Sequence, residues 1–309
     1  MAKIAFLFPG QGSQSVGMGK LFYEEIALAR EIFHEADETL GFKLSRLCFE
    51  GPEEDLKFTQ NTQPALLTVS CIAHRVLGIN PVIAAGHSLG EYSALVASGS
   101  LRFKDAVLLV HKRGIYMQEA VPIGEGAMAA VLGAEYGEVE KALSQVKHGI
   151  VKIANWNSRE QIVIAGNKAS VEESLDHLNN YKALMLPVSA PFHCDLMKSA
   201  EEKLSYDLNH VEFKDLKFPI ITNVDAAVIT RGEQARDALR RQVTRPVLWY
   251  TSMLLMEKEG IDLCVELGSG KVLSGLMKRI GREWSKRPEI LNVEDPDTLD
   301  SVRTGVQKF

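Results

Sequence analysis

Short runs of apolar residues alternate along the chain with longer stretches of helical periodicity. The runs at 3–8, 81–86 and 261–268 are almost uninterrupted, which predicts strands buried on both faces of a parallel sheet. Residues 18–41 and 103–121 repeat apolar positions every three or four residues, and each stretch predicts one amphipathic helix. Strands that alternate with helices in this way indicate an α/β fold.

The middle of the chain has a different order of elements. Between residue 124 and about residue 191 the pattern is strand, helix, strand, strand, helix, strand. This is the split β-α-β order of a ferredoxin-like unit. We therefore expect a small subdomain at 124–193 inserted into a larger α/β domain formed by 1–123 and 194–309.

Net charge, apolar runs and cysteine spacing indicate which classes of partner this chain is not expected to bind. The net charge of −5 gives no overall attraction to nucleic acid or anionic membranes, and no run of about 18 apolar residues predicts a membrane span. The apolar run 4–8 is too short for the core of a signal peptide. The four cysteines are widely spaced without a C-x-x-C pair, which is typical of a reduced cytoplasmic protein without structural metal. Nucleic-acid and membrane partners are not expected.

The sequence Gly86-His87-Ser88-Leu89-Gly90 follows the second apolar run and precedes a helix-forming stretch. G-x-S-x-G between a strand and a helix is typical of a nucleophile elbow, in which a tight turn exposes the serine hydroxyl. The alternative is a structural turn whose serine caps the helix. The strand before and the helix after favour the catalytic interpretation, with Ser88 as the nucleophile.

A serine nucleophile needs a base, and two histidines compete for this role. His193 lies in a short turn-prone stretch where the chain leaves the predicted subdomain, a kind of junction that often lines a cleft. His87 is adjacent to Ser88, but a neighbour on a tight turn points elsewhere. We prefer His193, and a purely structural histidine remains the other possibility.

Stabilisation of an oxyanion needs two N–H donors. The residue after the nucleophile, Leu89, supplies one, and a neighbouring loop supplies the other. The glycine-rich loop 10–14 follows the first strand and is the candidate, because it lacks the spacing of a nucleotide-binding loop.

Arg113 falls on the apolar stripe of the predicted helix 103–121, with Leu109 and Met117. A long arginine side chain on such a stripe can extend to water. The alternative is a carboxylate or phosphate partner inside the protein, because an unpaired inward charge is costly.

Seven segments together resemble the malonyl-CoA:acyl carrier protein transacylases and the related acyltransferase domains of polyketide synthases. They occur in order from residue 3 to about residue 282 and read FPGQGSQ, AAGHSLGEYSALVASG, RGIYMQ, ANWNSREQIVIAG, APFHC, RQVTRPVLW and ELGSGKVLSGLMKRI. The resemblance implies an α/β-hydrolase-like large domain with a parallel sheet and an inserted ferredoxin-like subdomain.

The resemblance also implies a role for each site residue. Ser88 is the nucleophile and His193 the base, Arg113 holds the malonyl carboxylate, the N–H groups of Gln11 and Leu89 form the oxyanion hole, and a main-chain carbonyl at Gln242 orients the histidine. Phe192 resembles the malonyl-selecting form of its motif, whereas Pro191 departs from the small residue that is common there.

The implied reaction moves malonyl from malonyl-CoA to the phosphopantetheine thiol of holo-acyl carrier protein, through a malonyl-serine ester and with ping-pong kinetics. No bound cofactor or metal is expected, since the coenzyme A thioester is the substrate. Two alternatives stay open: a serine esterase or thioesterase, and a carrier-binding scaffold without catalysis. For the carrier, Lys271, Lys278 and Arg282 on one helical run are candidate docking residues, against a solvated helix face or a surface within 231–245.

Overall fold

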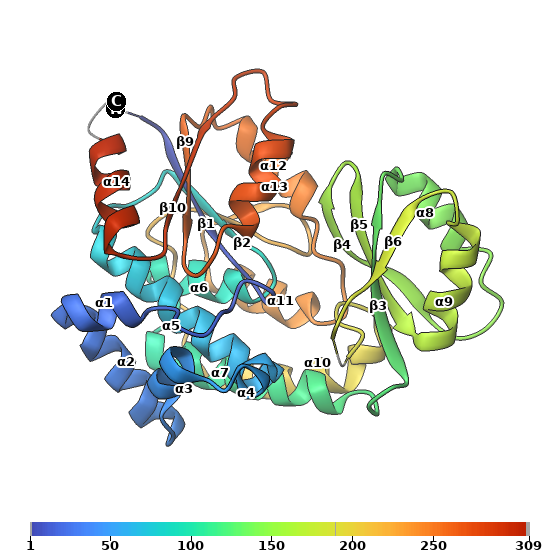
Figure 1. Ribbon diagram of the computed structural model, residues 1–309, viewed down its shortest axis with the longest axis horizontal. Helices are drawn as coiled ribbons and strands as arrows, with labels where there is room; N and C mark the ends of the chain where they lie inside the picture. The colour runs from blue at the N-terminus through green and yellow to red at the C-terminus, as the bar shows by residue number, and fades with distance from the viewer. Residues whose placement is uncertain (1, 189, 307–309) are drawn as a thin grey trace.

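The computed structural model describes residues 2–188 and 190–306, which form two sheets that lie side by side with their own helices (Figure 1). The larger sheet has the strand order β10-β9-β1-β2-β7-β8. Its strands are β1 Ile4–Phe8, β2 Ile83–Gly86, β7 Ile220–Ile221, β8 Val228–Ile229, β9 Leu263–Leu267 and β10 Glu289–Val293. All neighbours pair in parallel except β7 and β8.

The three apolar runs form the adjacent strands β9, β1 and β2, as the sequence predicts. Every residue of β1 is buried. Ile4, Phe6 and Phe8 pack into the core that contains the helices α5 Thr59–Leu77, α6 Leu89–Ala97 and α7 Phe103–Glu119. Ala5 and Leu7 pack on the other face against α12 Trp249–Glu257 and α13 Val272–Ile280. Two apolar faces explain why β1 shows no polar alternation.

The helices surround this sheet and the smaller one. Their bounds are α1 Lys20–Glu25, α2 Ala27–Leu40, α3 Leu44–Glu50, α4 Glu53–Lys57, α5 Thr59–Leu77, α6 Leu89–Ala97, α7 Phe103–Glu119, α8 Tyr136–Leu143, α9 Lys168–His177, α10 Lys198–Asn209, α11 Gly232–Gln242, α12 Trp249–Glu257, α13 Val272–Ile280 and α14 Pro296–Val306.

The single helix expected over 18–41 is wrong. The chain forms α1 and α2, separated by Ile26, whose φ of −119° and ψ of 119° are those of extended backbone. Ile26 donates its N–H to the carbonyl of Phe22 in α1, and its own carbonyl accepts from Arg30 in α2. Its extended backbone therefore ends the first helix and begins the second, which breaks the single helix that the apolar period predicts. The helix expected over 103–121 is confirmed as α7.

The smaller sheet contains β3 Gly126–Leu132, β4 Val151–Ser158, β5 Gln161–Asn167 and β6 Lys182–Met185. Its order is β4-β5-β3-β6 and all its pairs are antiparallel. With α8 and α9 between the strands, this is the β-α-β-β-α-β arrangement of a ferredoxin-like unit. The predicted fold class is therefore confirmed, while the proposed boundaries after residues 123 and 193 stay a prediction.

One strand of the small sheet also contacts the large domain. Trp156 in β4 donates its backbone N–H to the carbonyl of Val247, at 2.9 Å, and Val247 donates to Ala154, at 2.8 Å. Val247 precedes α12, so this short bridge fixes the small sheet beside the carboxyl ends of the large one. The ends of β1 and β2 lie at the same edge, where the candidate active site is found.

Candidate active site

Ser88 occupies a strained turn between β2 and α6. Its φ of 50° and ψ of −104° lie outside the regions that L-residues favour. A Cβ atom at Gly86 would collide with the backbone of Gly90, and one at Gly90 would collide with the carbonyl of Phe8 in β1. The two glycines of the motif are therefore required because the turn folds back on itself against a neighbouring strand.

The Ser88 hydroxyl lies against His193, with 2.8 Å between Oγ and Nε2. The other ring nitrogen, Nδ1, is 2.8 Å from the backbone carbonyl of Gln242, the last residue of α11. Since a carbonyl only accepts, Nδ1 carries the proton and Nε2 presents its lone pair to the serine. This tautomer is the one that a base for Ser88 requires.

Burial keeps the His193 ring uncharged. The residue is only 3% exposed, and desolvation, with the nearby charge of Arg113, lowers the pKa of His193 to about 3. The other candidate base, His87, is hydrogen-bonded to a different residue, with 2.8 Å between its Nε2 and Oδ1 of Asn157. The geometry brings Ser88 together with His193 rather than with its sequence neighbour.

Arg113 of α7 reaches the same hydroxyl from the other side. Arg113 is only 1% exposed, so the interpretation that its side chain extends to water is wrong. Nη2 donates to Ser88 Oγ, at 3.1 Å, and to Oε1 of Gln242, at 2.9 Å, while Nη1 donates to Oε1 of Gln63, at 2.8 Å. Burial lowers the pKa of Arg113, whereas Tyr92 and Glu91 act in the opposite direction. Among the described residues, the guanidinium therefore has only neutral acceptors as hydrogen-bond partners.

The two residues expected to supply oxyanion donors both line the cavity that contains Ser88. Leu89 is the first residue of α6, and the first N–H groups of a helix have no partner within it. Gln11 lines the small cavity around Ser88 with Leu89. The loop that carries Gln11 is held against the elbow, since the His87 N–H donates to the Phe8 carbonyl, at 3.0 Å. Neither N–H is hydrogen-bonded to another residue that the structure describes.

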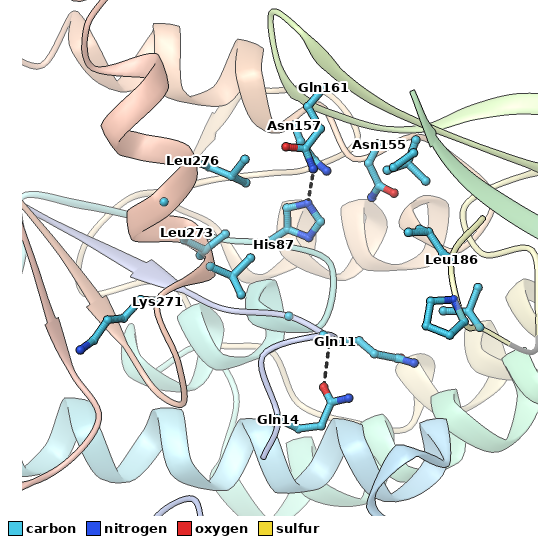
Figure 2. Close-up of a pocket in the computed structure, with 18 of the residues that line it drawn as sticks. Gln11, Gln14, His87, Asn155, Asn157, Gln161, Leu186, Lys271, Leu273 and Leu276 are labelled. Atoms are coloured by element: carbon cyan, nitrogen blue, oxygen red, sulfur yellow. Dashed lines mark hydrogen bonds between the residues drawn. The ribbon is translucent and has the colours of Figure 1, made fainter. Parts of the chain in front are cut away.

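Two adjoining cavities lead to this group. The inner one has a volume of about 110 Å³ and contains Ser88, Arg113 and Phe192 in its wall. The outer one, of about 700 Å³, lies between the glycine-rich loop, the small sheet and α13 (Figure 2). Gln11, His87, Asn155, Leu186 and Val188 line both. The outer cavity is large enough for an extended ligand, and its shared wall leads to the serine.

The three candidate docking residues differ in their surroundings. Lys271 precedes α13, lines the outer cavity and pairs with Glu294, at 3.0 Å. Lys278 and Arg282 are exposed. Arg279 between them also lines the cavity, and its Nη1 is 3.4 Å from Oε1 of Gln161 in the small domain. Of the exposed pair, only Lys278 lies on α13, whereas Arg282 follows the end of this helix at Ile280. The expectation that Lys271, Lys278 and Arg282 share one helical run is therefore wrong, because the helix spans only Val272–Ile280.

Sequence reasoning missed Gln63, Asn223 and Glu91. Asn223 accepts a hydrogen bond from the Ser88 N–H at its Oδ1, at 2.6 Å. A signal was available, because Asn223 is a polar residue just after a buried strand, at the edge where ligands bind in parallel sheets. Gln63 and Glu91 lie inside helical runs, and nothing in their spacing marks them as site residues.

Within the described part of the chain, no group of three or more His, Cys, Asp or Glu residues is arranged to hold a metal ion. No helix among those residues is long and apolar enough to cross a membrane. Pro191, the local departure from the motif, places its ring where a Cβ on Gly126 would collide with it, at the start of β3.

The sequence is similar to a known protein family and to characterised members of it. Residues 5–277 match the family described as acyl transferase domain. Malonyl CoA-acyl carrier protein transacylase of Bacillus subtilis is 48% identical over 308 residues, which is 97% of this chain and 96% of that protein. The protein of the same name from Escherichia coli is 46% identical over 288 residues, 91% of this chain and 93% of its own.

Solved structures agree with the sequence comparison. An acyl carrier protein S-malonyltransferase from Vibrio cholerae superposes with a TM-score of 0.94 at 44% identity, covering 97% of this chain and 100% of that one. A malonyl-transacylase solved in complex with a type II polyketide synthase acyl-carrier protein gives a TM-score of 0.94 at 41% identity, covering 98% and 100% of the two chains.

Proposed function

Because the chain belongs to the acyl transferase family, we propose that it transfers the malonyl group of malonyl-CoA to the phosphopantetheine thiol of holo-acyl carrier protein. One observation carries this proposal beyond family membership. The hydroxyl of Ser88 lies within hydrogen-bond distance of both a neutral histidine and a buried arginine. The first can activate a nucleophile, and the second can hold the free carboxylate of a malonyl group beside it.

In the first half-reaction Nε2 of His193 takes the proton of Ser88, and Oγ attacks the thioester carbonyl. The N–H groups of Leu89 and Gln11 stabilise the developing oxyanion. When the tetrahedral intermediate collapses, the C–S bond breaks and the sulfur of coenzyme A takes the proton from His193. The product is a malonyl ester on Ser88.

The second half-reaction reverses these steps with another thiol. The phosphopantetheine thiol gives its proton to His193 and attacks the ester, and Ser88 recovers the proton as the ester C–O bond breaks. The base starts and ends each half-reaction neutral, so no net proton has to leave the buried site. The outer cavity provides room for either thiol-bearing arm.

The direct test is intact-mass measurement after mixing the protein with malonyl-CoA. The proposal expects a mass increase of one malonyl group that holo-acyl carrier protein removes. An esterase or thioesterase would release the group to water at a rate that the carrier does not change. A scaffold without catalysis would form no adduct, and either result would reject the proposal.

Replacement of Arg113 by alanine is expected to remove the preference for malonyl. With acetyl-CoA the wild-type arginine keeps an unpaired buried charge, a penalty of about 3–5 kcal/mol when no other partner is present. Gln63 and Gln242 already accept from this guanidinium, so we expect the lower end, about a 10²-fold preference for malonyl. The measurement is kcat/KM for malonyl-CoA and acetyl-CoA in both proteins.

Lysine is the matched control at this position. It keeps the charge but not the planar pair of donors, so Arg113→Lys should restore malonyl transfer only in part. Acetyl transfer should be retained or rise in the alanine protein, because Ser88 and His193 are untouched. An unchanged ratio of malonyl to acetyl transfer in Arg113→Ala would mean that this arginine does not select the substrate.

For the carrier protein, we expect the double charge reversal Lys278→Glu with Arg282→Glu to raise the KM for holo-acyl carrier protein about 3- to 10-fold. Carrier proteins of this class are acidic, so exposed cations beside the cavity entrance attract them. The KM for malonyl-CoA should not change. The matched control reverses Arg46 and Lys104, two exposed cations outside both cavities; an equal effect there would reject docking on α13.

We propose that the reaction uses no bound cofactor, since every proton and bond is accounted for by the residues above and the two thiols. A cytoplasmic location is consistent with cysteines that are all buried and free in the structure. The transferred malonyl group would serve as extender unit for fatty-acid synthesis.

A further inference from the structure

The loop that follows β7 holds the nucleophile turn. Asn223 accepts from the Ser88 N–H at Oδ1, at 2.6 Å, and donates from Nδ2 to the Gly86 carbonyl, at 2.6 Å. A donor at one end and an acceptor at the other fix the orientation of the amide. The conformation of the elbow thus depends on where Asn223 is placed.

The end of α11 holds the other two groups of the site. The backbone carbonyl of Gln242 accepts from His193, and its side-chain Oε1 accepts from Arg113. Its Nε2 donates to the Ser88 carbonyl, at 3.1 Å. Gln242 is fully buried, so the positions of the base and of the arginine both depend on this one residue.

Glu91 joins these two residues. It lies in the first turn of α6, three residues after the nucleophile, and is completely buried. Its Oε2 accepts from the backbone N–H of Asn223, at 3.0 Å, and from Nε2 of Gln242, at 2.8 Å. Its Oε1 is buried without a hydrogen-bond partner among the described residues. A buried carboxyl is costly to maintain, and the reaction steps above do not use this one.

We propose, on the basis of the function proposed above, that Glu91 is a positioning residue: by accepting from Asn223 and Gln242 at one oxygen, it fixes Ser88, His193 and Arg113 relative to one another. The two hydrogen bonds accepted at that oxygen carry the effect. Burial raises the pKa of Glu91 to about 7, while the hydrogen bonds from Asn223 and Gln242 act in the opposite direction. Both donors are accepted at Oε2, and Oε1 has no hydrogen-bond partner among the described residues. An amide whose oxygen takes the place of Oε2 accepts the same two bonds and should therefore replace the carboxyl.

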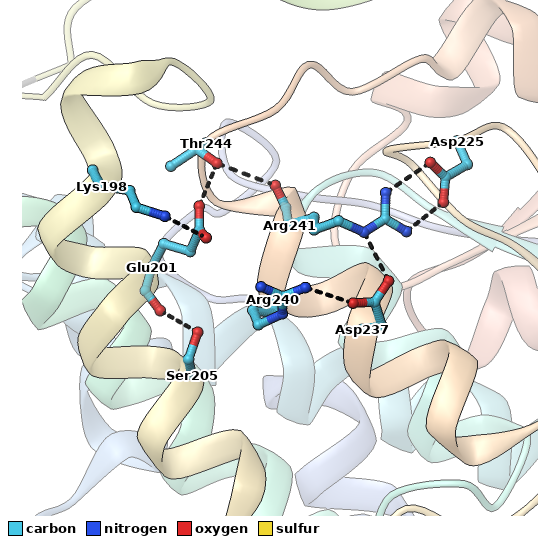
Figure 3. A network of polar contacts seen from close by, with 8 residues as sticks. All are labelled: Lys198, Glu201, Ser205, Asp225, Asp237, Arg240, Arg241 and Thr244. Atoms are coloured by element: carbon cyan, nitrogen blue, oxygen red, sulfur yellow. Dashed lines mark hydrogen bonds and ion pairs between the residues drawn. The ribbon is translucent and has the colours of Figure 1, made fainter.

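A second connection between the same two segments lies at the surface. Arg241, next to Gln242, makes a two-bond contact with Asp225, at 2.8 and 2.6 Å, and contacts Asp237, at 2.8 Å (Figure 3). The side chains of Arg241 and Asp225 are 33% and 45% exposed. Exposed ion pairs contribute little, so this connection serves as a comparison for the buried one.

The test uses rapid-quench acylation of the full chain by malonyl-CoA, which gives the fraction of Ser88 acylated and the rate constant separately. Glu91→Ala should reach the wild-type fraction about 100-fold more slowly, since a displacement of about 1 Å at reacting atoms can cost this much. Glu91→Gln should stay within about threefold of wild type. Asp225→Asn, which removes a carboxylate from the same segment at the surface, should also stay within about threefold.

A role in folding alone predicts a different result, because it would lower the fraction acylated and leave the rate constant of the folded protein unchanged. If Glu91→Ala does not fold, Glu91→Asp replaces it: the shorter carboxylate cannot reach both donors, and we expect acylation about tenfold slower. The inference would be overturned by a wild-type acylation rate in Glu91→Ala or Glu91→Asp, by slow acylation in Glu91→Gln, or by equal slowing in Asp225→Asn. Failure of the proposed function is distinct, because the wild-type protein itself would then form no serine adduct.

Discussion

Replacement of Ser88 by alanine is expected to abolish the malonyl adduct completely while the protein stays folded. The hydroxyl of Ser88 is the atom that would carry the acyl group, and neither His193 nor Arg113 can form the ester. The side chain makes no capping hydrogen bond to α6, and alanine tolerates the positive φ as poorly as serine does. We therefore expect a change in unfolding free energy within about 1 kcal/mol.

The matched control is Ser93→Ala. Ser93 lies on the same helix, is fully buried and makes no hydrogen bond with its side chain among the described residues. This variant should form the adduct as the wild type does. Intact-mass measurement with malonyl-CoA distinguishes the two proteins. An adduct on Ser88→Ala would move the nucleophile to another residue and reject the assignment.

The strands around the site could be predicted because their burial is complete. β1, β2 and β9 lie in the centre of the sheet, with helices on both faces, so their sequences carry an unbroken apolar signal. The nucleophile elbow was equally visible, since the close approach of Gly86 and Gly90 to backbone leaves no alternative to glycine.

Helix α5 illustrates what periodicity does not show. It runs from Thr59 to Leu77 between other helices and the sheet, and most of its residues are buried, including Thr62, Gln63 and Thr68. A helix that is covered on most sides has no polar face, and Thr62 and Thr68 donate to backbone carbonyls inside the protein instead. Gln63 therefore looked like an ordinary helical residue although it contacts Arg113.

The partners of the site residues come from distant parts of the chain. Ser88, Asn223 and Gln242 meet because β2 and β7 are neighbours in the sheet and α11 returns to the same edge. No local pattern encodes that meeting, so the role of Gln242 could be inferred only from the family resemblance. The turn-prone stretch around His193 favoured this histidine over His87, but it did not exclude a structural histidine. Neither the local pattern nor the resemblance pointed to Glu91, because a glutamate in the first turn of a helix is ordinarily a surface residue that interacts favourably with the helix dipole.

Replacement of His193 by alanine is expected to slow both half-reactions by about 10⁴-fold or more, because one base serves the attack and the release. The two rates are measured separately, as acylation by malonyl-CoA and as transfer from the preformed ester to holo-acyl carrier protein. Since burial holds the pKa of His193 at about 3, its ring stays neutral and able to accept a proton. Protonation of this residue should therefore not reduce wild-type acylation between about pH 8 and pH 5.

His87 provides the comparison that separates the two candidate bases. Its Nε2 is bonded to Asn157 and its ring packs against Trp249, with 5.5 Å between ring centroids. His87→Ala should therefore disturb the wall of the cavity and lose far less than the 10⁴-fold expected for His193→Ala. Equal rates in wild type and His193→Ala would transfer the role of base to His87. A loss of wild-type acylation centred near pH 6.5 that disappears in His193→Ala would instead show that His193 titrates as an exposed histidine, contrary to its burial between Ser88 and Gln242.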